Sequence, residues 1–382
     1  MKRKLGTLAA ILGATLALGA CSTDNNSDAV ASSEGETIRI AVAAPLTGAN
    51  ADYGIGFLRA TNLQAEEWNA NGGLLGQQIE IVAFDDANDP NEASQVAQRI
   101  ASEGGFAGVI GPFSSGVGLT VAPIYEENDI ILISPTASNP VFTTLGENIF
   151  RVNTLNQDEV QAIVDIITDQ LGHTRIGLIS ILTDFGALSA NSMFSIVEGI
   201  EGVEVVAHEE IVETTSDFRP AISNLMDADA EVVVVVGMYS ILGPLAVQYR
   251  ELDPNIDIVA FGSAYTYNLI DLAGPSVEGV LIPVSFYAGA EYDEVRDFVG
   301  RFVGEHDQIP SNLTAQAYDA AGALFTAIEM AGTIDSSQVR EALIANTYEG
   351  VTGPIAFDAD GGLKERVFRT LVIENGTFVE VR

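Results

Sequence analysis

The amino-acid sequence predicts an α/β fold in which two open parallel sheets each carry helices on both faces. From Thr37 onward, short apolar runs typical of β-strands alternate with longer amphipathic segments, which is the pattern of such a sheet. Residues 232–236 are five consecutive valines, and continuous β-branched content is typical of parallel strands buried on both faces. The succession of strands and helices that ends at about Asn156 begins again at about Gln157. This repetition of the strand and helix pattern favours two similar sheets over one long sheet.

The first 20 residues have the features of an export signal. A basic start, residues 2–4, precedes an uncharged apolar stretch, residues 5–20, which is shorter than the ~20 residues of a membrane-spanning helix. The segment 18–21, Leu-Gly-Ala-Cys, contains the only cysteine of the chain, Cys21. It resembles the lipobox of bacterial lipoproteins, in which the cysteine is acylated. An ordinary cleaved signal followed by a chance cysteine is the alternative. Residues 21–36 are polar and lack periodicity, which predicts a flexible tether.

The strands expected after the tether are short and rich in Val and Ile. The expected helices show apolar residues at the helical spacing of about 3.6 residues. We expect strands at residues 38–42, 79–84, 108–110, 130–133, 176–181, 203–207, 232–236, 258–260 and 280–282, and helices at residues 56–69, 92–103, 158–171 and 313–331.

The charge of the chain excludes one large class of function. The chain has 53 Asp and Glu residues against 17 Lys and Arg residues, and its net charge is -36. Nucleic-acid binding depends on Lys and Arg that displace counterions from phosphates, so this excess of acid excludes it. It also argues against a face that lies on anionic lipid. Because hydrophobic residues make up 47% of the chain and charged residues 18%, we expect a globule with a large core and an acidic surface.

Catalytic and metal-binding motifs are missing from the sequence. The three histidines share no local motif, and neither a His-Glu-x-x-His nor a Cys-x-x-Cys pattern occurs. The sequence has no Gly-x-Ser-x-Gly nucleophile elbow and no Walker A loop. The acidic cluster at residues 85–89 lacks the spacing of an EF-hand and is interpreted as a structural turn. We therefore expect a protein that is not an enzyme and has no cofactor or metal.

Two loops that follow expected strands carry hydroxyl groups suited to an anion. In open parallel sheets, ligands lie beyond the carboxyl ends of the strands. Ser115 falls at the start of a helix that runs to about Glu127, where its hydroxyl and free backbone amides would receive an anion. Thr136 and Ser138 lie in the loop after the strand at 130–133. Together they predict a carboxylate site, although capping or turn chemistry explains each residue taken singly.

These segments resemble the periplasmic leucine/isoleucine/valine-binding proteins of ABC importers. The resemblance rests on Gly-Val-Ile-Gly-Pro-Phe-Ser-Ser at 108–115, Pro-Ile-Tyr-Glu-Glu at 123–127 and Ile-Leu-Ile-Ser-Pro-Thr-Ala-Ser-Asn-Pro at 131–140, and it extends over residues 37–382. It implies the type I periplasmic-binding-protein fold, in which two Rossmann-like lobes joined by three hinge crossovers close on a ligand. By this resemblance, we expect an N-terminal lobe of residues 37–156 plus 286–367 and a C-terminal lobe of residues 157–285 plus 368–382.

The resemblance also implies a set of ligand-binding residues. The positions that hold the ligand carboxylate in the family match Ser115 and the loop Thr136-Ala137-Ser138, and the aromatic positions of the pocket match Tyr53, Phe185 and Tyr239.

The position expected to bind the ligand ammonium departs from the family. In the leucine-type proteins an acidic residue follows the strand matching residues 258–261, and this chain has Ala264 there. A buried ammonium without a carboxylate would be costly. Asp184 is therefore a candidate substitute, although the role of a solvent-facing turn residue explains it equally well. Tyr265, the next residue after Ala264, would add aromatic surface to the site instead.

These observations predict an extracytoplasmic, membrane-anchored lipoprotein that is the solute-binding component of an ABC importer. We expect a monomer, anchored by lipid at Cys21, that traps a small carboxylate such as a branched-chain or related amino acid and delivers it to permease subunits. A ligand without an amine, a carboxylate or an amide, is one alternative in the same role. Activation of a cell-wall synthase by a lipoprotein of the same fold is another, although relatives of that kind lack a complete ligand cleft.

Overall fold

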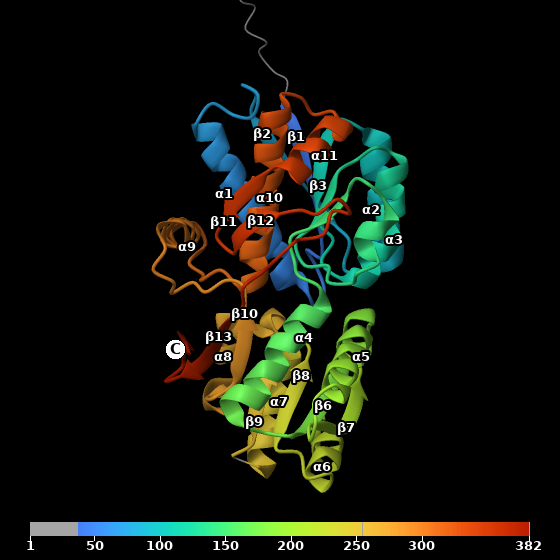
Figure 1. The fold of residues 1–382 in the computed structure, drawn as a ribbon. Coiled ribbons are helices and arrows are strands. Elements are labelled where there is room, and N and C mark those ends of the chain that lie inside the picture. The colour runs from blue at the N-terminus through green and yellow to red at the C-terminus, as the bar shows by residue number, and fades with distance from the viewer. Residues whose placement is uncertain (1–36, 254, 382) are drawn as a thin grey trace, which may run out of the picture. The chain divides into compact units, whose positions relative to one another are not determined.

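The computed structural model describes residues 37–253 and 255–381, so the predicted signal, Cys21 and the whole of the predicted tether lie outside the described residues. Two large sheets with their helices make up this part of the chain (Figure 1). The predicted α/β class with two lobes is therefore confirmed. Within the described ranges, no helix has the length and apolar character needed to span a membrane.

The first sheet is parallel throughout and has the strand order β2-β1-β3-β4-β5. The expected strand at 130–133 forms two residues later, as β4, because Ile130 and Ile131 still belong to the approach from the preceding helix. The first sheet and the helices between its strands consist of β1 (Ile38–Ala44), α1 (Ala51–Ala70), β2 (Ile79–Asp85), α2 (Pro90–Glu103), β3 (Phe106–Ile110), α3 (Ser115–Glu127), β4 (Leu132–Ser134), η1 (Phe142–Leu145) and β5 (Ile149–Arg151).

A later part of the chain returns to cover this sheet. Helix α10 (Asn312–Ala331) packs against α1, β3 and β4, and α11 (Ser336–Ala345) packs on α10. Helix α9 (Asp293–His306) also contacts α1. A hairpin of β11 (Thr347–Gly350) and β12 (Gly353–Ala356) follows α11. The first lobe is thus assembled from two stretches of chain.

The second sheet has the order β14-β13-β10-β9-β8-β6-β7. The predicted helix at 158–171 is a shorter α-helix that continues as a π-helical turn, η2. The elements of this lobe are α4 (Asn156–Asp165), η2 (Ile166–Leu171), β6 (Arg175–Ile181), α5 (Asp184–Glu198), β7 (Glu204–Ile211), α6 (Arg219–Asp227), β8 (Val232–Val236), α7 (Tyr239–Leu252), β9 (Asp257–Ala260), η3 (Gly262–Ala264), α8 (Tyr267–Ala273), η4 (Gly274–Val277), β10 (Leu281–Val284), β13 (Arg369–Glu374) and β14 (Thr377–Glu380).

The prediction of parallel sheets is wrong at one edge of the second sheet. Strand β13 runs antiparallel to β10, and β14 runs antiparallel to β13. The chain leaves this lobe after Val284 and re-enters it at Arg369, and these two residues are paired in the register. The returning strand must therefore run back along β10. Asn375 and Gly376 both have positive φ, 53° and 70°, which is the backbone of a tight two-residue hairpin turn.

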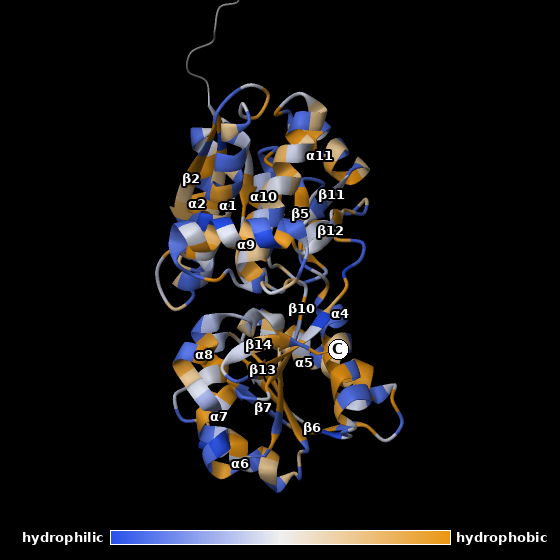
Figure 2. Cartoon of the chain, turned by 90° about the vertical axis from the view of Figure 1, so that its left-hand side faces the viewer, coloured by the Kyte–Doolittle hydropathy of each residue, from blue (hydrophilic) through white to orange (hydrophobic). Residues whose placement is uncertain are grey.

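The buried apolar residues of both lobes come from the strands and from the inner faces of the helices. Figure 2 shows hydrophobic residues along the strands and hydrophilic residues on the outer sides of many helices. The five valines of β8 are buried, as the sequence pattern predicts. Three crossovers connect the sheets: β5 to α4, β10 to α9, and β12 to β13. The crossovers bring the carboxyl ends of both sets of parallel strands toward the same region.

Candidate functional site

One cavity lies between residues of the two lobes at the carboxyl ends of their strands. It encloses about 60 Å³. Four of the residues singled out in the sequence line it: Ser115, Thr136, Ser138 and Phe185. The remaining wall is formed by Phe113, Ser114, Asn153, Glu159, Met238, Ser263, Asn312 and Leu313.

Ser115 is the first residue of α3, and it is almost completely buried. The cap of the helix is its neighbour, Ser114, whose Oγ accepts a hydrogen bond from the Val117 amide. The Ser115 Oγ accepts hydrogen bonds from the amides of Ser138, at 3.2 Å, and Asn139, at 3.3 Å. Both bonds use the oxygen as acceptor, so the hydroxyl proton remains to be donated to a third group. The position suits a ligand carboxylate at the helix N-terminus.

The loop after β4 is held by hydrogen bonds of its own. The Thr136 hydroxyl donates to the Phe113 carbonyl at 2.5 Å. The Ala137 amide donates to the Ser134 Oγ at 2.8 Å. Ala137 is buried and does not line the cavity. The loop therefore presents Thr136 and Ser138 to the cavity in a fixed arrangement.

Tyr53 and Tyr239 connect the two lobes beside the cavity. The Tyr53 hydroxyl donates to the Ser263 carbonyl at 2.9 Å, and the Tyr239 amide donates to the Tyr53 oxygen at 3.4 Å. The Tyr239 hydroxyl donates to the carboxylate of Asp52. Burial raises the pKa of Tyr239 to about 12, so this hydroxyl keeps its proton near neutral pH. The ring of Tyr53 stacks on Phe113, with centroids 5.2 Å apart, and thereby supports the cavity wall.

Asp184 and Phe185 begin α5, and only Phe185 reaches the cavity. The Phe185 ring packs edge-on against Phe261 at 5.5 Å. Asp184 is exposed, and its carboxylate lies by α3, where a Cβ added to Gly116 would come within 2.8 Å of Oδ2. The structure therefore does not bring Asp184 to the cavity.

Ala264 and Tyr265 lie in the hydrophobic core and do not line the cavity. Both are 1% exposed. The Tyr265 oxygen accepts a hydrogen bond from the Ala288 amide at 3.0 Å, and its ring packs edge-on against Phe378 at 4.7 Å. The contribution of this segment to the cavity comes from Ser263.

Glu159 lines the cavity and was not identified from the sequence. It lies in the first turn of α4, and its Oε1 accepts a hydrogen bond of 2.6 Å from the amide of Gly262. Burial raises the pKa of Glu159 to about 7, and the hydrogen bond from Gly262 opposes that rise. From the sequence alone, this residue looks like any acid in the first turn of a helix, where negative charge is favoured. Only the tertiary structure shows that it faces a cavity.

A family model described as periplasmic binding protein matches residues 37–377. The chain belongs to the periplasmic binding protein family. It is 32% identical over 336 residues to the leucine-, isoleucine-, valine-, threonine-, and alanine-binding protein of Pseudomonas aeruginosa, covering 86% of this chain and 88% of that protein. It is 30% identical over 328 residues to Leu/Ile/Val-binding protein homolog 2 of Brucella abortus, covering 85% and 87%. The resemblance stated from the sequence is confirmed.

Solved structures of other periplasmic binding proteins share the fold. The branched-chain amino acid transporter substrate binding protein LivJ of Streptococcus pneumoniae, in complex with isoleucine, has a TM-score of 0.83 at 24% identity, covering 91% of this chain and 100% of that chain. A solute binding protein of R. palustris in complex with benzoate has a TM-score of 0.82 at 20% identity, covering 91% and 96%. These similarities confirm the type I fold. The first of the two proteins is in complex with an amino acid, and the second is in complex with a carboxylate that has no amine.

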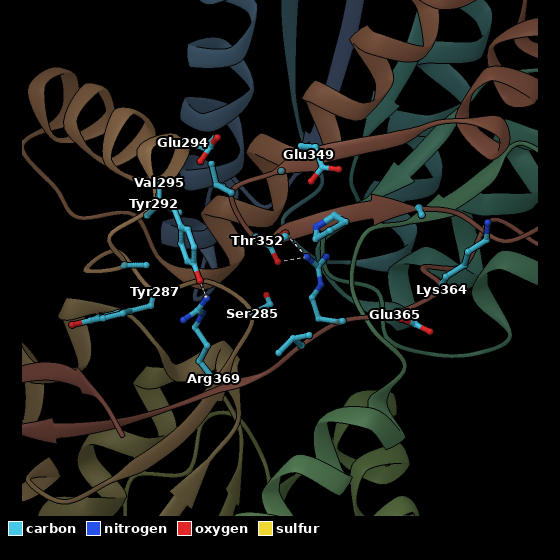
Figure 3. A pocket seen from close by; sticks show the side chains of 18 residues that line it. Ser285, Tyr287, Tyr292, Glu294, Val295, Glu349, Thr352, Lys364, Glu365 and Arg369 are labelled. Atoms are coloured by element: carbon cyan, nitrogen blue, oxygen red, sulfur yellow. Dashed lines mark hydrogen bonds between the residues drawn. The ribbon is translucent and has the colours of Figure 1, made fainter. Parts of the chain in front are cut away.

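A larger cavity of this periplasmic binding protein, about 790 Å³, lies at the crossovers (Figure 3). None of the residues singled out in the sequence lines it. Two of its three basic side chains, those of Arg366 and Arg369, have partners within the protein, and the third is that of Lys364. The Arg369 guanidinium donates to the Tyr292 hydroxyl at 2.9 Å and to Glu380 at 2.7 Å, and Arg366 donates to the carbonyl of Thr352 at 2.5 Å. We therefore assign ligand binding to the smaller cavity, where the hydroxyl groups converge.

Proposed function

We propose that the protein is the solute-binding component of an ABC importer, anchored outside the cytoplasm through lipid at Cys21. Its two lobes close on a small carboxylate and deliver it to a permease. The observation that supports this function most directly is the convergence of Ser115, Thr136 and Ser138 on one cavity at the N-terminus of α3. The Ser115 hydroxyl, which keeps a proton to donate, and the amides of a helix N-terminus are suited to a carboxylate, whereas the Thr136 hydroxyl donates to the Phe113 carbonyl and helps to hold the loop.

Thermal denaturation of protein freed of bound ligand tests this proposal. The protein is unfolded, dialysed and refolded, and it is then heated with leucine, valine, alanine, 4-methylpentanoate or benzoate. A ligand present at about 100 times its dissociation constant should stabilise the folded state by about 2.7 kcal/mol. We expect at least one of these carboxylates to raise the midpoint. A refolded protein with native circular dichroism whose midpoint none of them raises would contradict the proposal.

Ser115→Ala provides the matched variant for the same measurement. The substitution removes the hydroxyl that would donate to the carboxylate, so we expect about 10-fold weaker binding and a smaller ligand-induced shift. Ser102→Ala is the control, because Ser102 is exposed and, among the described residues, its hydroxyl bonds only to the Arg99 carbonyl of its own helix. Equal shifts in both variants would argue that the ligand lies elsewhere.

A further inference from the structure

Building on the proposed carboxylate-binding function, we infer that Glu159 binds the ammonium group of the ligand, so that the ligand is an amino acid. The sequence has Ala264 at the position where the resemblance to the leucine-type proteins implies an acid. Glu159 comes from a different element, α4, and reaches the same loop by accepting a hydrogen bond from Gly262. A carboxylate therefore stands beside the 261–264 segment although none is encoded in it.

The charge of Glu159 has no counterpart in the part of the chain that the structure describes. Its Oε1 bonds to the Gly262 amide, and its Oε2 has no hydrogen-bond partner among the described residues. No Lys or Arg of the described chain forms an ion pair with it. A half-buried carboxylate without a cation is unfavourable, and the raised pKa reflects this cost. A ligand ammonium that enters the cavity supplies the missing positive charge.

The lining of the cavity contains groups of opposite chemical character. The first lobe contributes hydroxyl groups near the N-terminus of α3, and the second lobe contributes the carboxylate of Glu159. The apolar side chains of Phe185, Met238 and Leu313 also line the cavity. A zwitterion with an apolar side chain matches this set of groups. A carboxylate without an amine leaves Glu159 unpaired, so the cavity discriminates against it.

The small volume of the cavity favours a ligand with a short side chain. About 60 Å³ corresponds to about four to six water-sized atoms, at roughly 10–15 Å³ each. Alanine and valine therefore belong in the test beside leucine.

Isothermal titration calorimetry with matched ligand pairs tests the role of Glu159. The probes are alanine with propanoate, valine with 3-methylbutanoate, and leucine with 4-methylpentanoate; the members of each pair differ only in the amine. Wild-type protein should prefer the amino acid of at least one pair. Glu159→Gln should weaken binding of that amino acid by about 10- to 100-fold and leave the deaminated acid bound as well as before or better. Glu159→Asp, which keeps the charge, should recover part of the preference.

Asp158→Asn is the matched control, because Asp158 is an exposed acid in the same helical turn and does not line the cavity. It should leave the preference unchanged. Retention of the full preference by Glu159→Gln, or an equal loss in Asp158→Asn, would overturn the inference. Wild-type protein that binds the deaminated acids as tightly as the amino acids would also overturn it, while the carboxylate-binding function would stand. Binding of none of the six probes to wild-type protein would contradict both.

Discussion

Replacement of Asp319 by alanine is expected to lower the free energy of unfolding by about 3–5 kcal/mol. Asp319 lies on α10 and is completely buried. Its Oδ1 accepts a hydrogen bond from the Val351 amide at 2.8 Å, and its Oδ2 accepts bonds from the amide of Thr352 at 2.8 Å and from the Thr352 hydroxyl. The same threonine accepts from Arg366, which also donates to the Val152 carbonyl at 2.6 Å.

This network explains the size of the expected effect. It joins α10, the turn between β11 and β12, and two of the three crossovers. Alanine at position 319 would leave two buried amides and a hydroxyl without acceptors, and each such loss costs about 1–3 kcal/mol. Urea denaturation of wild type and variant measures the difference.

Asp335→Ala and Asp319→Asn are the comparisons for this experiment. Asp335 caps α11 at the surface, where its Oδ1 accepts from the Gln338 amide at 3.2 Å, so its loss should cost only about 1 kcal/mol. Asp319→Asn keeps the shape and one acceptor oxygen, and it should fall between the two. An Asp319→Ala protein no less stable than Asp335→Ala would show that the network contributes little.

Replacement of Gly186 by alanine is expected to cost about 3 kcal/mol, although alanine normally favours a helix. Gly186 lies in the first turn of α5, and a Cβ there would be 1.8 Å from the Ile181 carbonyl oxygen at the end of β6. The start of the helix would have to move away from the strand. Phe185 would move with it, so ligand affinity should fall together with the stability measured in urea.

The first lobe has an equally close helix–backbone contact at Gly54, where a Cβ would be 1.9 Å from the Pro45 carbonyl oxygen. Gly54→Ala should therefore behave like Gly186→Ala and displace Tyr53. Gly304→Ala in α9 is the control, because no described atom outside its chain neighbours and the backbone of its own helix lies within 4 Å of its Cβ position. It should gain up to about 1 kcal/mol. A Gly186→Ala protein that gains stability like the control would refute this account.

Local pattern was sufficient to predict the strands that form the centres of both sheets. The five-valine run, for example, is β8 with the predicted bounds. The sequence analysis expected no strand at β13 or β14. Their antiparallel direction depends on where the chain re-enters the lobe, which is a property of the whole topology. The Asn375-Gly376 pair between them is a hairpin signal that could have been used.

The residues of the candidate site also fall into those that the sequence could predict and one that it could not. Ser115, Thr136 and Ser138 follow strands of one sheet, so their convergence can be inferred from strand order. Glu159 reaches the cavity from a helix of the other lobe, and no local pattern distinguishes a cavity-facing acid from a solvated one. Glu159 can take the role expected of an acid at position 264 only because α4 lies against the 261–264 segment. That contact is known only from the tertiary structure.

The return of the chain to each lobe determines when folding can finish. Helix α10, which covers β3 and β4, begins at Asn312, and β13, which covers the edge of β10, begins at Arg369. A growing chain that ends before residue 312 lacks part of the first core, and one that ends before residue 369 leaves β10 with an open edge. Unpaired edges promote association between chains. The core of the first lobe therefore stays incomplete until α10 has been made, and the edge of β10 stays open to other chains until β13 has been made.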